Sequence, residues 1–289
     1  MKAQPPAVSV IMRSFNEAWA IGDTIRQLSA QDFAGDIELI VIDSGSSDGS
    51  LEIIKAAEPA KLIEIPLGTY VPGVVLNRGA REASHEWLVY LNADATPVGD
   101  NWLSELLQPC MDNPRLGAAF SRQIPRPDCK AVFAHDYDRC FGPKRESGQW
   151  GHFFSMVSSV THRSLLEKHP IREDLQYAED DEWTRRLAAA GYQIVYAGNS
   201  VVMHSHNYSL AQVRKRSRGD ALAVAMAGNA PAHGRNFLRQ VALGAARDCA
   251  RDVGWCLRHG RSSGLPFAGL ARLWQRYGAW EGFNLRNPS

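Results

Sequence analysis

Acidic and hydroxyl side chains follow apolar runs of the sequence at the points where those runs end. The run at residues 37–42 leads directly into Asp43, with Ser46 close behind. A carboxylate in this place can accept a hydrogen bond from a nucleobase N–H while a neighbouring hydroxyl binds the ribose. The alternative is an ordinary turn that caps the next helix, because aspartate, serine and glycine are common in turns and at helix N-caps.

A second apolar run, at residues 87–91, leads into Asn92 and Asp94. One carboxylate, together with diphosphate oxygens and waters, is a usual way to hold Mg²⁺ or Mn²⁺. A simple turn is the alternative. Further along, His204 and His206 follow a strand-like segment. Histidines at a strand end near acids can ligate a metal, although a single histidine there is more often structural.

Four consecutive acids, residues 179–182, begin a predicted helix at 179–190. Negative charge at a helix N-terminus interacts favourably with the helix dipole, so a solvated first turn explains part of the pattern. Four adjacent carboxylates also repel one another. This repulsion raises the pKa of one of them, which suits that group to act as a general base.

The elements that must position these groups alternate between strand and helix. Continuous apolar runs at residues 8–12 and 37–42 suit parallel strands buried on both faces, with a helix-like stretch at 19–30 between them. The repetition predicts an α/β fold with an open, mostly parallel sheet flanked by helices. Ligands of such sheets bind beyond the carboxyl ends of the strands, where the polar groups described above lie.

Two further segments limit the interpretation. No Gly-x-Gly-x-x-Gly motif follows either early strand, which argues against a dinucleotide-binding Rossmann domain. Residues 124–151 are rich in proline and charge and show little periodicity, so we expect a loop region there. Residues 150–159 combine aromatic rings with hydroxyls, a mixture that suits a sugar and equally suits a core strand. Candidate acceptor-binding residues in and after this stretch are Trp150, Phe154, Glu179 and Trp183.

Charge divides the chain into an acidic body and a basic tail. The whole chain carries 32 Lys and Arg against 31 Asp and Glu, which gives no case for a nucleic-acid partner. Residues 212–289 hold 13 of the basic and 4 of the acidic residues. The first residues lack the apolar stretch of an export signal, and no run of about 18 apolar residues occurs. Together with five cysteines and no Cys-x-x-Cys pair, these features predict a cytoplasmic protein.

The tail is predicted to be helical beyond residue 234. Apolar residues recur at helical spacing from Phe237 to Cys256, with arginines on the opposite face, and a second set rich in tryptophan and tyrosine follows. Such helices suit peripheral contact with an anionic membrane leaflet. Packing on the rest of the chain, or on a second subunit of a homodimer, is the alternative. The basic segment around Arg216 suits a phosphate and equally suits exposure to solvent.

Five stretches, taken in order, resemble the inverting family 2 glycosyltransferases with the GT-A fold. They are VSVIMRSFNE, LIVIDSGSSDGS, VYLNADATP, AEDDEWTRRLAAAGYQIVY and VVMHSHNYSL. The stretches SRQIPRP and HSHNYSL look most like bacterial rhamnosyltransferases of surface polysaccharide synthesis. The resemblance implies a GT-A catalytic domain at residues 1–220, and the helical, basic C-terminal extension then occupies residues 221–289.

The resemblance also implies roles for individual residues. Asp180 would be the catalytic base, and Asp94 with His204 would bind a divalent cation, Mg²⁺ or Mn²⁺. The common Asp-x-Asp pair of the family is Asn92-x-Asp94 here, which weakens the contact usually given to the first carboxylate. The residues expected to bind the nucleotide are Ser14, Asn16, Glu17, Asp43, Ser46, Asn92 and Arg216.

The implied reaction is inverting transfer of a sugar, by preference L-rhamnose from dTDP-rhamnose, to a hydroxyl of a saccharide or lipid-linked acceptor. This reaction would serve bacterial polysaccharide or lipopolysaccharide synthesis at the cytoplasmic face of the inner membrane. The same reaction with a UDP-hexose or UDP-N-acetylhexosamine donor is one alternative. A non-catalytic module that binds nucleotide sugars or polysaccharide is another, which Asn92 allows. A nucleotidyltransferase would need a basic phosphate loop after the first strand, where Arg13 stands alone.

Overall fold

The structure is a computed structural model that describes residues 6–111, 113–143, 145–149 and 153–285. Its residues form two compact units. The first comprises Met1–Ile124, Glu146–Asp174 and Glu179–His204. The second comprises Pro125–Arg145, Leu175–Ala178 and Ser205–Ser289. It therefore contains the predicted extension, two earlier segments, and the residues from 205 to 220, where the helix Leu210–Met226 begins.

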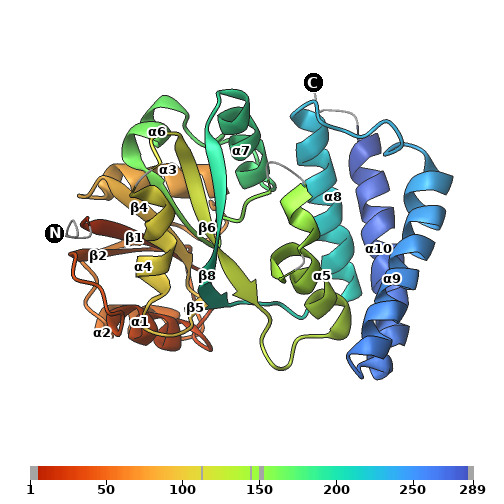
Figure 1. The fold of residues 1–289 in the computed structure, drawn as a ribbon, viewed down its shortest axis with the longest axis horizontal. Coiled ribbons are helices and arrows are strands. Elements are labelled where there is room, and N and C mark those ends of the chain that lie inside the picture. The colour runs from red at the N-terminus through yellow and green to blue at the C-terminus, as the bar shows by residue number, and fades with distance from the viewer. Residues whose placement is uncertain (1–5, 112, 144, 150–152, 286–289) are drawn as a thin grey trace. The chain divides into compact units, whose positions relative to one another are not determined.

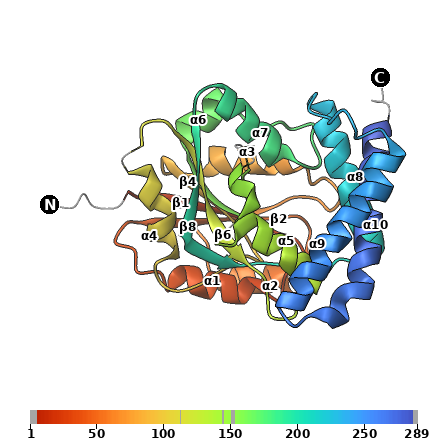
Figure 2. The same cartoon turned by 45° about the vertical axis from the view of Figure 1, so that its right-hand side comes forward.

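The first unit is built on an eight-stranded sheet with the order β3-β2-β1-β4-β7-β6-β8-β5 (Figure 1). Neighbours among β1 to β4 are parallel, as are β6 and β8, whereas β7 is antiparallel to both β4 and β6. Figure 2 shows the long strands β6 and β8 side by side. The predicted open, mostly parallel sheet is thereby confirmed. The strands are β1 (Val8–Ser14), β2 (Ile37–Asp43), β3 (Lys61–Glu64), β4 (Trp87–Asn92), β5 (Thr96–Pro97), β6 (Leu116–Ile124), β7 (Ser158–His162) and β8 (Gln193–Met203).

Helices cover both faces of this sheet, which explains why its central strands are apolar throughout. Val10 and Met12 of β1 join a core cluster that includes side chains of α1, α2 and α4. Ile11, which points the other way, meets α3 at Gly79, where a Cβ would lie 2.4 Å from the Ile11 side chain. The helices of this unit are α1 (Ile21–Ser29), α2 (Ser50–Ala56), α3 (Pro72–Glu82), α4 (Trp102–Leu107), α6 (Arg163–Lys168) and α7 (Glu179–Ala189), with 3₁₀ turns at Gln108–Cys110 and Glu146–Gln149.

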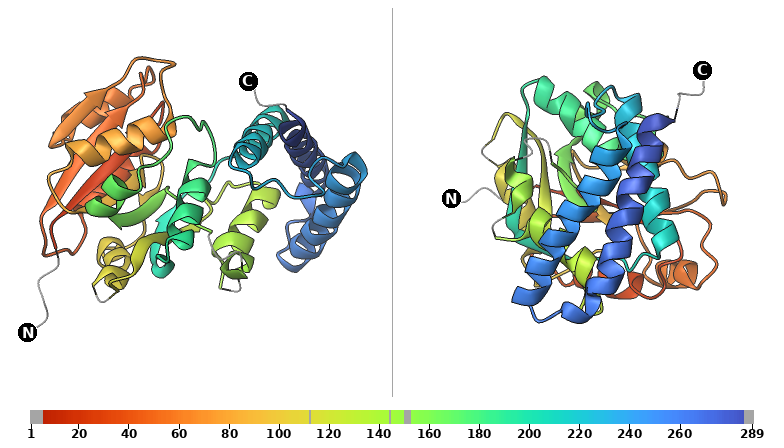
Figure 3. Two further views of the ribbon diagram at one scale, coloured as in Figure 1. Left: turned by 90° about the horizontal axis from the view of Figure 1, so that it is seen from above. Right: turned by 90° about the vertical axis from the view of Figure 1, so that its right-hand side faces the viewer.

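The second unit is helical, and Figure 3 shows its three longest helices side by side. Helices α8 and α10 pack closely because α10 presents glycines to α8: a Cβ on Gly278 would lie 2.4 Å from the carbonyl oxygen of Arg214. No described helix is both long and apolar enough to cross a membrane. The elements are α5 (Ala131–Phe141), α8 (Leu210–Met226), a π-helical turn (Leu238–Leu243), α9 (Gly244–Arg258), a 3₁₀ turn (Ser262–Gly264) and α10 (Leu265–Asn284).

One expectation for this unit was wrong. The stretch expected to be a loop contains α5, whose buried face includes His135, hydrogen-bonded to Asp252 of α9. Along the apolar face predicted for the tail, Phe237 and Val253 are 51% and 42% exposed, so packing within the chain covers that face only in part. Asp252 of α9 is buried, because arginine and histidine partners compensate its charge.

Candidate active site

The polar groups that follow β1, β2 and β4 meet at one edge of the sheet. Because β1 lies between β2 and β4, Ser14 is paired with Asp43 and Arg13 with Asn92. The parallel register therefore brings together three loops that are far apart in the sequence. This convergence is what the strand pattern predicted.

The loops after β1 and β2 hold each other through reciprocal hydrogen bonds. The backbone N–H of Asn16 donates to Ser46 Oγ at 2.9 Å, and the N–H of Ser47 donates to Asn16 Oδ1 at 2.8 Å. The backbone of Asn16 is left-handed, with φ of 54°, a conformation that asparagine tolerates better than most residues. Asn16 and Ser46 therefore fix the shape of the rim that they were predicted to line.

Asp43 is fully buried and organises the turn that follows it. Its Oδ1 accepts the N–H groups of Gly45 at 3.0 Å and Ser46 at 2.8 Å, and its Oδ2 accepts the Ser46 hydroxyl at 2.6 Å. The turn considered from the sequence is thus present. It is compatible with base recognition, because a carboxylate offers about four acceptor positions.

Arg13 connects three parts of the site. It donates to the Tyr70 hydroxyl at 3.0 Å and to Asn92 Oδ1 at 2.7 Å, and it lies 3.8 Å from Glu179 Oε1 in an ion pair. Burial opposes its charge, but Tyr70 and Glu179 outweigh burial and raise the pKa of Arg13. The sequence analysis missed this role of Arg13 and Tyr70. The one available signal was the position of Arg13 directly before the last residue of β1.

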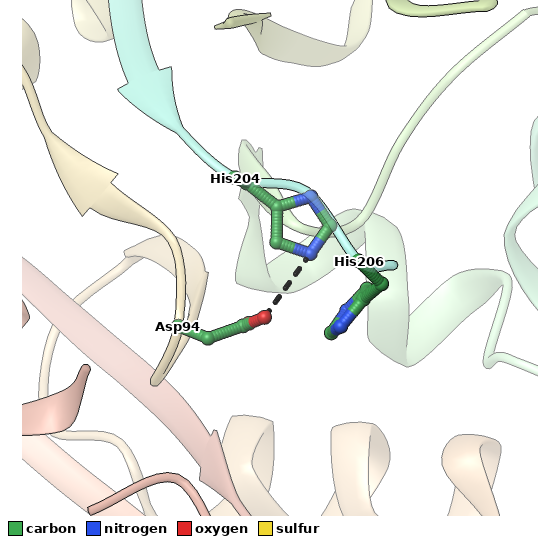
Figure 4. Close-up of side chains that lie close together, drawn as sticks. All are labelled: Asp94, His204 and His206. Atoms are coloured by element: carbon green, nitrogen blue, oxygen red, sulfur yellow. Dashed lines mark ion pairs between the residues drawn. The ribbon is translucent and has the colours of Figure 1, made fainter. Parts of the chain in front are cut away.

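Asp94 and His204 face each other within the first unit, as Figure 4 shows. His204 Nδ1 lies 2.9 Å from Gln123 Oε1, and the amide nitrogen of Gln123 donates to Ser155 at 2.7 Å. Gln123 therefore accepts a hydrogen from Nδ1, which directs the Nε2 lone pair toward Asp94 Oδ2, 3.5 Å away. His206 follows two residues later in the chain, at the start of the second unit.

The donor set at this edge suits a hard divalent cation. Asp94 is fully buried, and a carboxylate together with an imidazole at metal distances of ~2.1 Å places the two donor atoms ~3–3.5 Å apart. Glu17 adds a second acid nearby, and burial together with Asp94 raises its pKa to about 8. Ser14 Oγ is buried and has no hydrogen-bond partner among the described residues. This edge therefore holds one acid with a raised affinity for a proton and an unused hydroxyl.

Three of the four acids of α7 form separate ion pairs. Glu179 pairs with Arg13, and the other two ion pairs are local ones along the helix. Their N–O distances are both 2.8 Å, for Asp181 with Arg185 and for Glu182 with Arg186.

Asp180 differs from its three neighbours, since it forms no ion pair within the described ranges. Its carboxylate accepts only backbone N–H groups, from Asp181 at 2.9 Å and from Met156 at 3.4 Å. Burial raises the pKa of Asp180, and the charge of Asp181 raises it further. The two backbone hydrogen bonds lower this pKa but do not cancel the rise. The cluster thus leaves Asp180 with a raised affinity for a proton and without an ion pair among the described residues, although Arg13 acts on it from beyond ion-pair distance.

The family model described as glycosyl transferase family 2 matches residues 9–169 of this chain. The chain belongs to that family. It is a glycosyltransferase with the GT-A fold, which confirms the family, fold and enzyme class expected from the five motifs.

Relatives of this glycosyltransferase include enzymes of polysaccharide synthesis. It is 24% identical to the O-antigen chain rhamnosyltransferase of Salmonella typhimurium over 213 residues, 70% of this chain and 67% of that one. It is 27% identical to the O-antigen chain rhamnosyltransferase of Salmonella anatum over 190 residues, 62% of this chain and 60% of that one. The predicted likeness to rhamnosyltransferases is confirmed as a similarity of sequence.

Two solved structures share the fold of this glycosyltransferase. The mannosyltransferase of Pyrobaculum calidifontis, solved with GDP-mannose and Mn²⁺, aligns over 96% of this chain and 85% of its own, with a TM-score of 0.64 and 21% identity. The glucosyl-3-phosphoglycerate synthase of Mycobacterium tuberculosis, solved with Mn²⁺, UDP and its product, covers 79% of this chain and 82% of its own, with a TM-score of 0.56 and 20% identity.

The candidate acceptor residues of the glycosyltransferase lie in different environments. Trp183 is fully buried, and its Nε1–H donates to the carbonyl oxygen of His169. Phe154 is also buried, and the centre of its ring lies 5.8 Å from the centre of the Trp183 ring. Trp183 thus anchors α7 in the core, and Phe154 packs beside it from a segment that is not a strand. Glu179 is buried against Arg13. Trp150 lies outside the described residues.

Arg216, a predicted nucleotide contact, belongs to α8 of the second unit. Its guanidinium lies over the ring of Tyr208, 4.8 Å from the ring centre. The other nucleotide residues predicted from the sequence all belong to the first unit. Binding of the nucleotide by Arg216 stays a prediction.

Proposed function

We propose that this enzyme transfers a sugar with inversion, from a nucleoside-diphosphate donor to a hydroxyl of a growing saccharide. L-Rhamnose from dTDP-rhamnose is the preferred donor, supported by the names of the two Salmonella relatives. A UDP-hexose or UDP-N-acetylhexosamine donor is the second candidate. It is favoured by the fold shared with a glucosyl synthase solved with UDP-glucose and by 29% identity to a poly-β-1,6-N-acetyl-D-glucosamine synthase of Staphylococcus epidermidis.

The isolated Asp180 carboxylate is the observation that carries the proposal. An acceptor hydroxyl loses its proton to Asp180 while its oxygen bonds to the anomeric carbon of the donor. The bond from that carbon to the diphosphate oxygen breaks on the opposite face, and the leaving oxygen takes the electron pair. A base positioned for such a proton transfer contributes about 10²–10⁴-fold to the rate. The other three acids of α7 are engaged by arginines and are poorer bases for this step.

A divalent cation, Mg²⁺ or Mn²⁺, fits the leaving side of the site. Asp94 and His204 would hold it, with His206 as the next candidate ligand along the chain. Such an ion supplies positive charge to the departing diphosphate. Gln123 fixes the ring of His204 in the orientation that ligation needs. Both solved relatives named above were crystallised with Mn²⁺.

The nucleotide is proposed to lie over the loops after β1, β2 and β4. Ser14 offers its unused hydroxyl, Asp43 its buried carboxylate and Glu17 an acid with a raised pKa. Asn16 and Ser46 shape that rim through the hydrogen bonds between the loops. Asn92, held by Arg13, presents a neutral amide where a ribose or diphosphate would approach.

A panel of nucleotide sugars tests this function directly. The protein is incubated with dTDP-rhamnose, UDP-glucose or UDP-N-acetylglucosamine, with Mn²⁺ or with a chelator, and release of the nucleoside diphosphate is measured. Release from dTDP-rhamnose that needs Mn²⁺ and is lost in Asp180→Asn is the expected result. Absence of release from every donor would refute the assignment, and preference for a UDP sugar would replace the donor.

We further propose that the second unit attaches the enzyme to the cytoplasmic face of the inner membrane, where a lipid-linked acceptor would lie. Its last two helices expose leucines, with Leu257 and Leu270 being 65% and 51% exposed, beside several arginines. Leu257→Glu with Leu270→Glu should reduce sedimentation with anionic vesicles, whereas Leu67→Glu, which is 70% exposed but in the first unit, should not. Equal sedimentation of the wild type, the double variant and Leu67→Glu would contradict membrane attachment through these leucines. A concentration-dependent dimer that the double variant loses would assign the leucines to contact with a second subunit instead.

A further inference from the structure

A cavity of about 160 Å³ lies within the second unit among α5, α8 and α10. Apart from Arg216, a predicted nucleotide contact, it shares no residue with the candidate active site, and every residue that lines it belongs to the second unit. Its buried floor is mainly apolar, while its walls and rim are polar. The other lining residues used below are Phe133, Asp136, Tyr208, Ser217, Asp220, Arg272 and Gln275.

One wall of the cavity is aromatic and the others carry hydrogen-bonding groups. Phe133 and Tyr208 meet edge to face, with ring centres 5.7 Å apart and planes at 83°. Ser217 and Asp220 face the same space from α8. Aromatic carbon beside a few placed hydroxyl, carboxylate and amide groups suits a ligand with both C–H faces and hydroxyls.

The positive charge at the floor of the cavity is already neutralised. Arg272 is buried and binds Asp136 through two nitrogens at 2.9 and 2.8 Å, and it binds Asp252 through Nε at 2.8 Å. Asp252 in turn lies 2.6 Å from His135 Nδ1. Arg216 and Asp220 also line the cavity, so its charged lining consists of two arginines and two acids with no excess of positive charge, which favours a neutral polar ligand.

The same buried network orients the polar groups that reach the cavity. Arg272 donates to Gln275 Oε1 at 2.8 Å, which directs the amide nitrogen of Gln275 away as a hydrogen-bond donor. The two bonds from Arg272 hold Asp136 in one rotamer. Buried ion pairs contribute little net stability because both charges are desolvated, so the benefit of this network is the fixed geometry of the groups it positions.

The size of the cavity limits the ligand further. At ~30 Å³ for each water, 160 Å³ is the space of about five waters, and drug-sized ligands need at least ~300 Å³. The enclosed volume therefore matches a single sugar ring better than a nucleoside diphosphate. Tyr208 also lies only four residues after His204, on a segment anchored by the bond from the N–H of Arg126 to Ser205 Oγ at 3.0 Å.

We propose that this cavity binds one neutral sugar residue of the saccharide acceptor. The identification of that sugar as part of the acceptor rests on the function proposed above, whereas the binding of a neutral monosaccharide does not. Because the cavity shares no residue with the sheet edge, occupation of it would strengthen acceptor binding and leave the chemistry at Asp180 unchanged.

Saturation-transfer NMR with free monosaccharides tests the proposal in the absence of any donor. The probes are L-rhamnose, D-mannose, D-galactose and N-acetyl-D-glucosamine, each added to the full chain. At least one should receive saturation from the protein. Ser217→Phe, which fills the cavity from the surface of α8, should abolish that transfer, and Asp220→Asn should weaken it several-fold. Ala211→Phe adds the same ring to an exposed position of α8 outside the cavity and should change nothing.

The two proposals can fail separately. Absence of transfer to every sugar in the wild type, or transfer that persists in Ser217→Phe at the wild-type level, would overturn the cavity assignment. Release of nucleoside diphosphate from a nucleotide sugar would be unaffected by either result. Binding of a monosaccharide without turnover of any nucleotide sugar would instead refute the proposed reaction and leave the sugar-binding cavity standing.

Discussion

Arg13 donates a 2.7 Å hydrogen bond to Asn92 Oδ1, at the position where related sequences commonly carry the first carboxylate of an Asp-x-Asp pair. The Arg13 guanidinium donates its hydrogen bond to the only side-chain oxygen of Asn92, the atom that a cation would otherwise use. The neutral amide thus removes one negative charge from an edge that already holds Asp94 and Glu17. The asparagine is accommodated by a specific partner, and Asp94 is left as the carboxylate proposed to bind the cation.

This pairing predicts the effect of Asn92→Asp. The new carboxylate would form a charge-assisted bond with Arg13, so it would contribute little to cation binding. We expect the affinity for Mn²⁺, measured by calorimetry with the nucleoside diphosphate present, to change by less than ~3-fold, which is well under 1.4 kcal/mol. Tightening by tenfold or more would mean that residue 92 reaches the ion directly. Asp94→Asn, by comparison, should abolish the calorimetric signal of the cation.

Asp180→Asn should lower kcat by ~10²–10⁴-fold, because the amide cannot take the acceptor proton. The affinity for the nucleoside diphosphate should remain within ~3-fold, since the base and the proposed nucleotide loops are separate. Asp181→Asn is the matched control: its carboxylate pairs with Arg185 on the helix surface, a contact worth at most about 1 kcal/mol. Equal loss of kcat in both variants, or retained turnover in Asp180→Asn, would remove Asp180 from the role of base.

The same substitution should stabilise the protein at neutral pH. Burial raises the pKa of Asp180 above that of the unfolded chain, so folding favours the protonated form. The stability associated with that form is fully present below the unfolded pKa of ~3.9 and is lost as pH rises through the folded pKa. Asparagine mimics the protonated carboxyl. Thermal melts should therefore show a higher Tm for Asp180→Asn than for wild type at pH 7, with the difference disappearing near pH 3.5.

A Tm that is equal or lower at pH 7 would show that the carboxylate is stabilised by its surroundings, against the electrostatics described for α7. The acid limb of kcat offers an independent measurement. Because the base must be deprotonated, kcat should fall as pH decreases through the raised pKa of Asp180, above the range of an ordinary aspartate.

The sheet, and the edge where polar groups follow β1, β2 and β4, were predictable because both depend on local sequence patterns. Apolar runs such as residues 37–42 specify strands buried on both faces, and the parallel register then places Ser14 beside Asp43 without further information. The acid that lacks an ion pair could not be identified in the same way. Asp180 and Asp181 are equivalent in sequence, and only the contacts of each carboxylate distinguish them.

The helical unit was harder to predict because its core is partly ionic. Periodicity assigns apolar residues to the buried face of a helix, so α5 was missed and the burial of Asp252 in α9 was not foreseen. Their burial depends on Arg272 and His135, partners that are 20 and 117 residues from Asp252 in the chain. Charge compensation over such separations leaves no signature in a local hydrophobic pattern.

Gln123 provides the sharpest test of the proposed cation site, because it acts on His204 without touching the ion. Gln123→Leu removes the acceptor for Nδ1–H and frees the ring to rotate, so the affinity for Mn²⁺ should fall about 10–100-fold. Gln123→Glu keeps an acceptor oxygen at the same place and should restore most of that loss. Ser155→Ala, which removes only the far partner of Gln123, should have a smaller effect. Electron paramagnetic resonance of free Mn²⁺ with the nucleoside diphosphate present measures all three, and unchanged Mn²⁺ affinity in Gln123→Leu would exclude His204 as a ligand oriented by this residue.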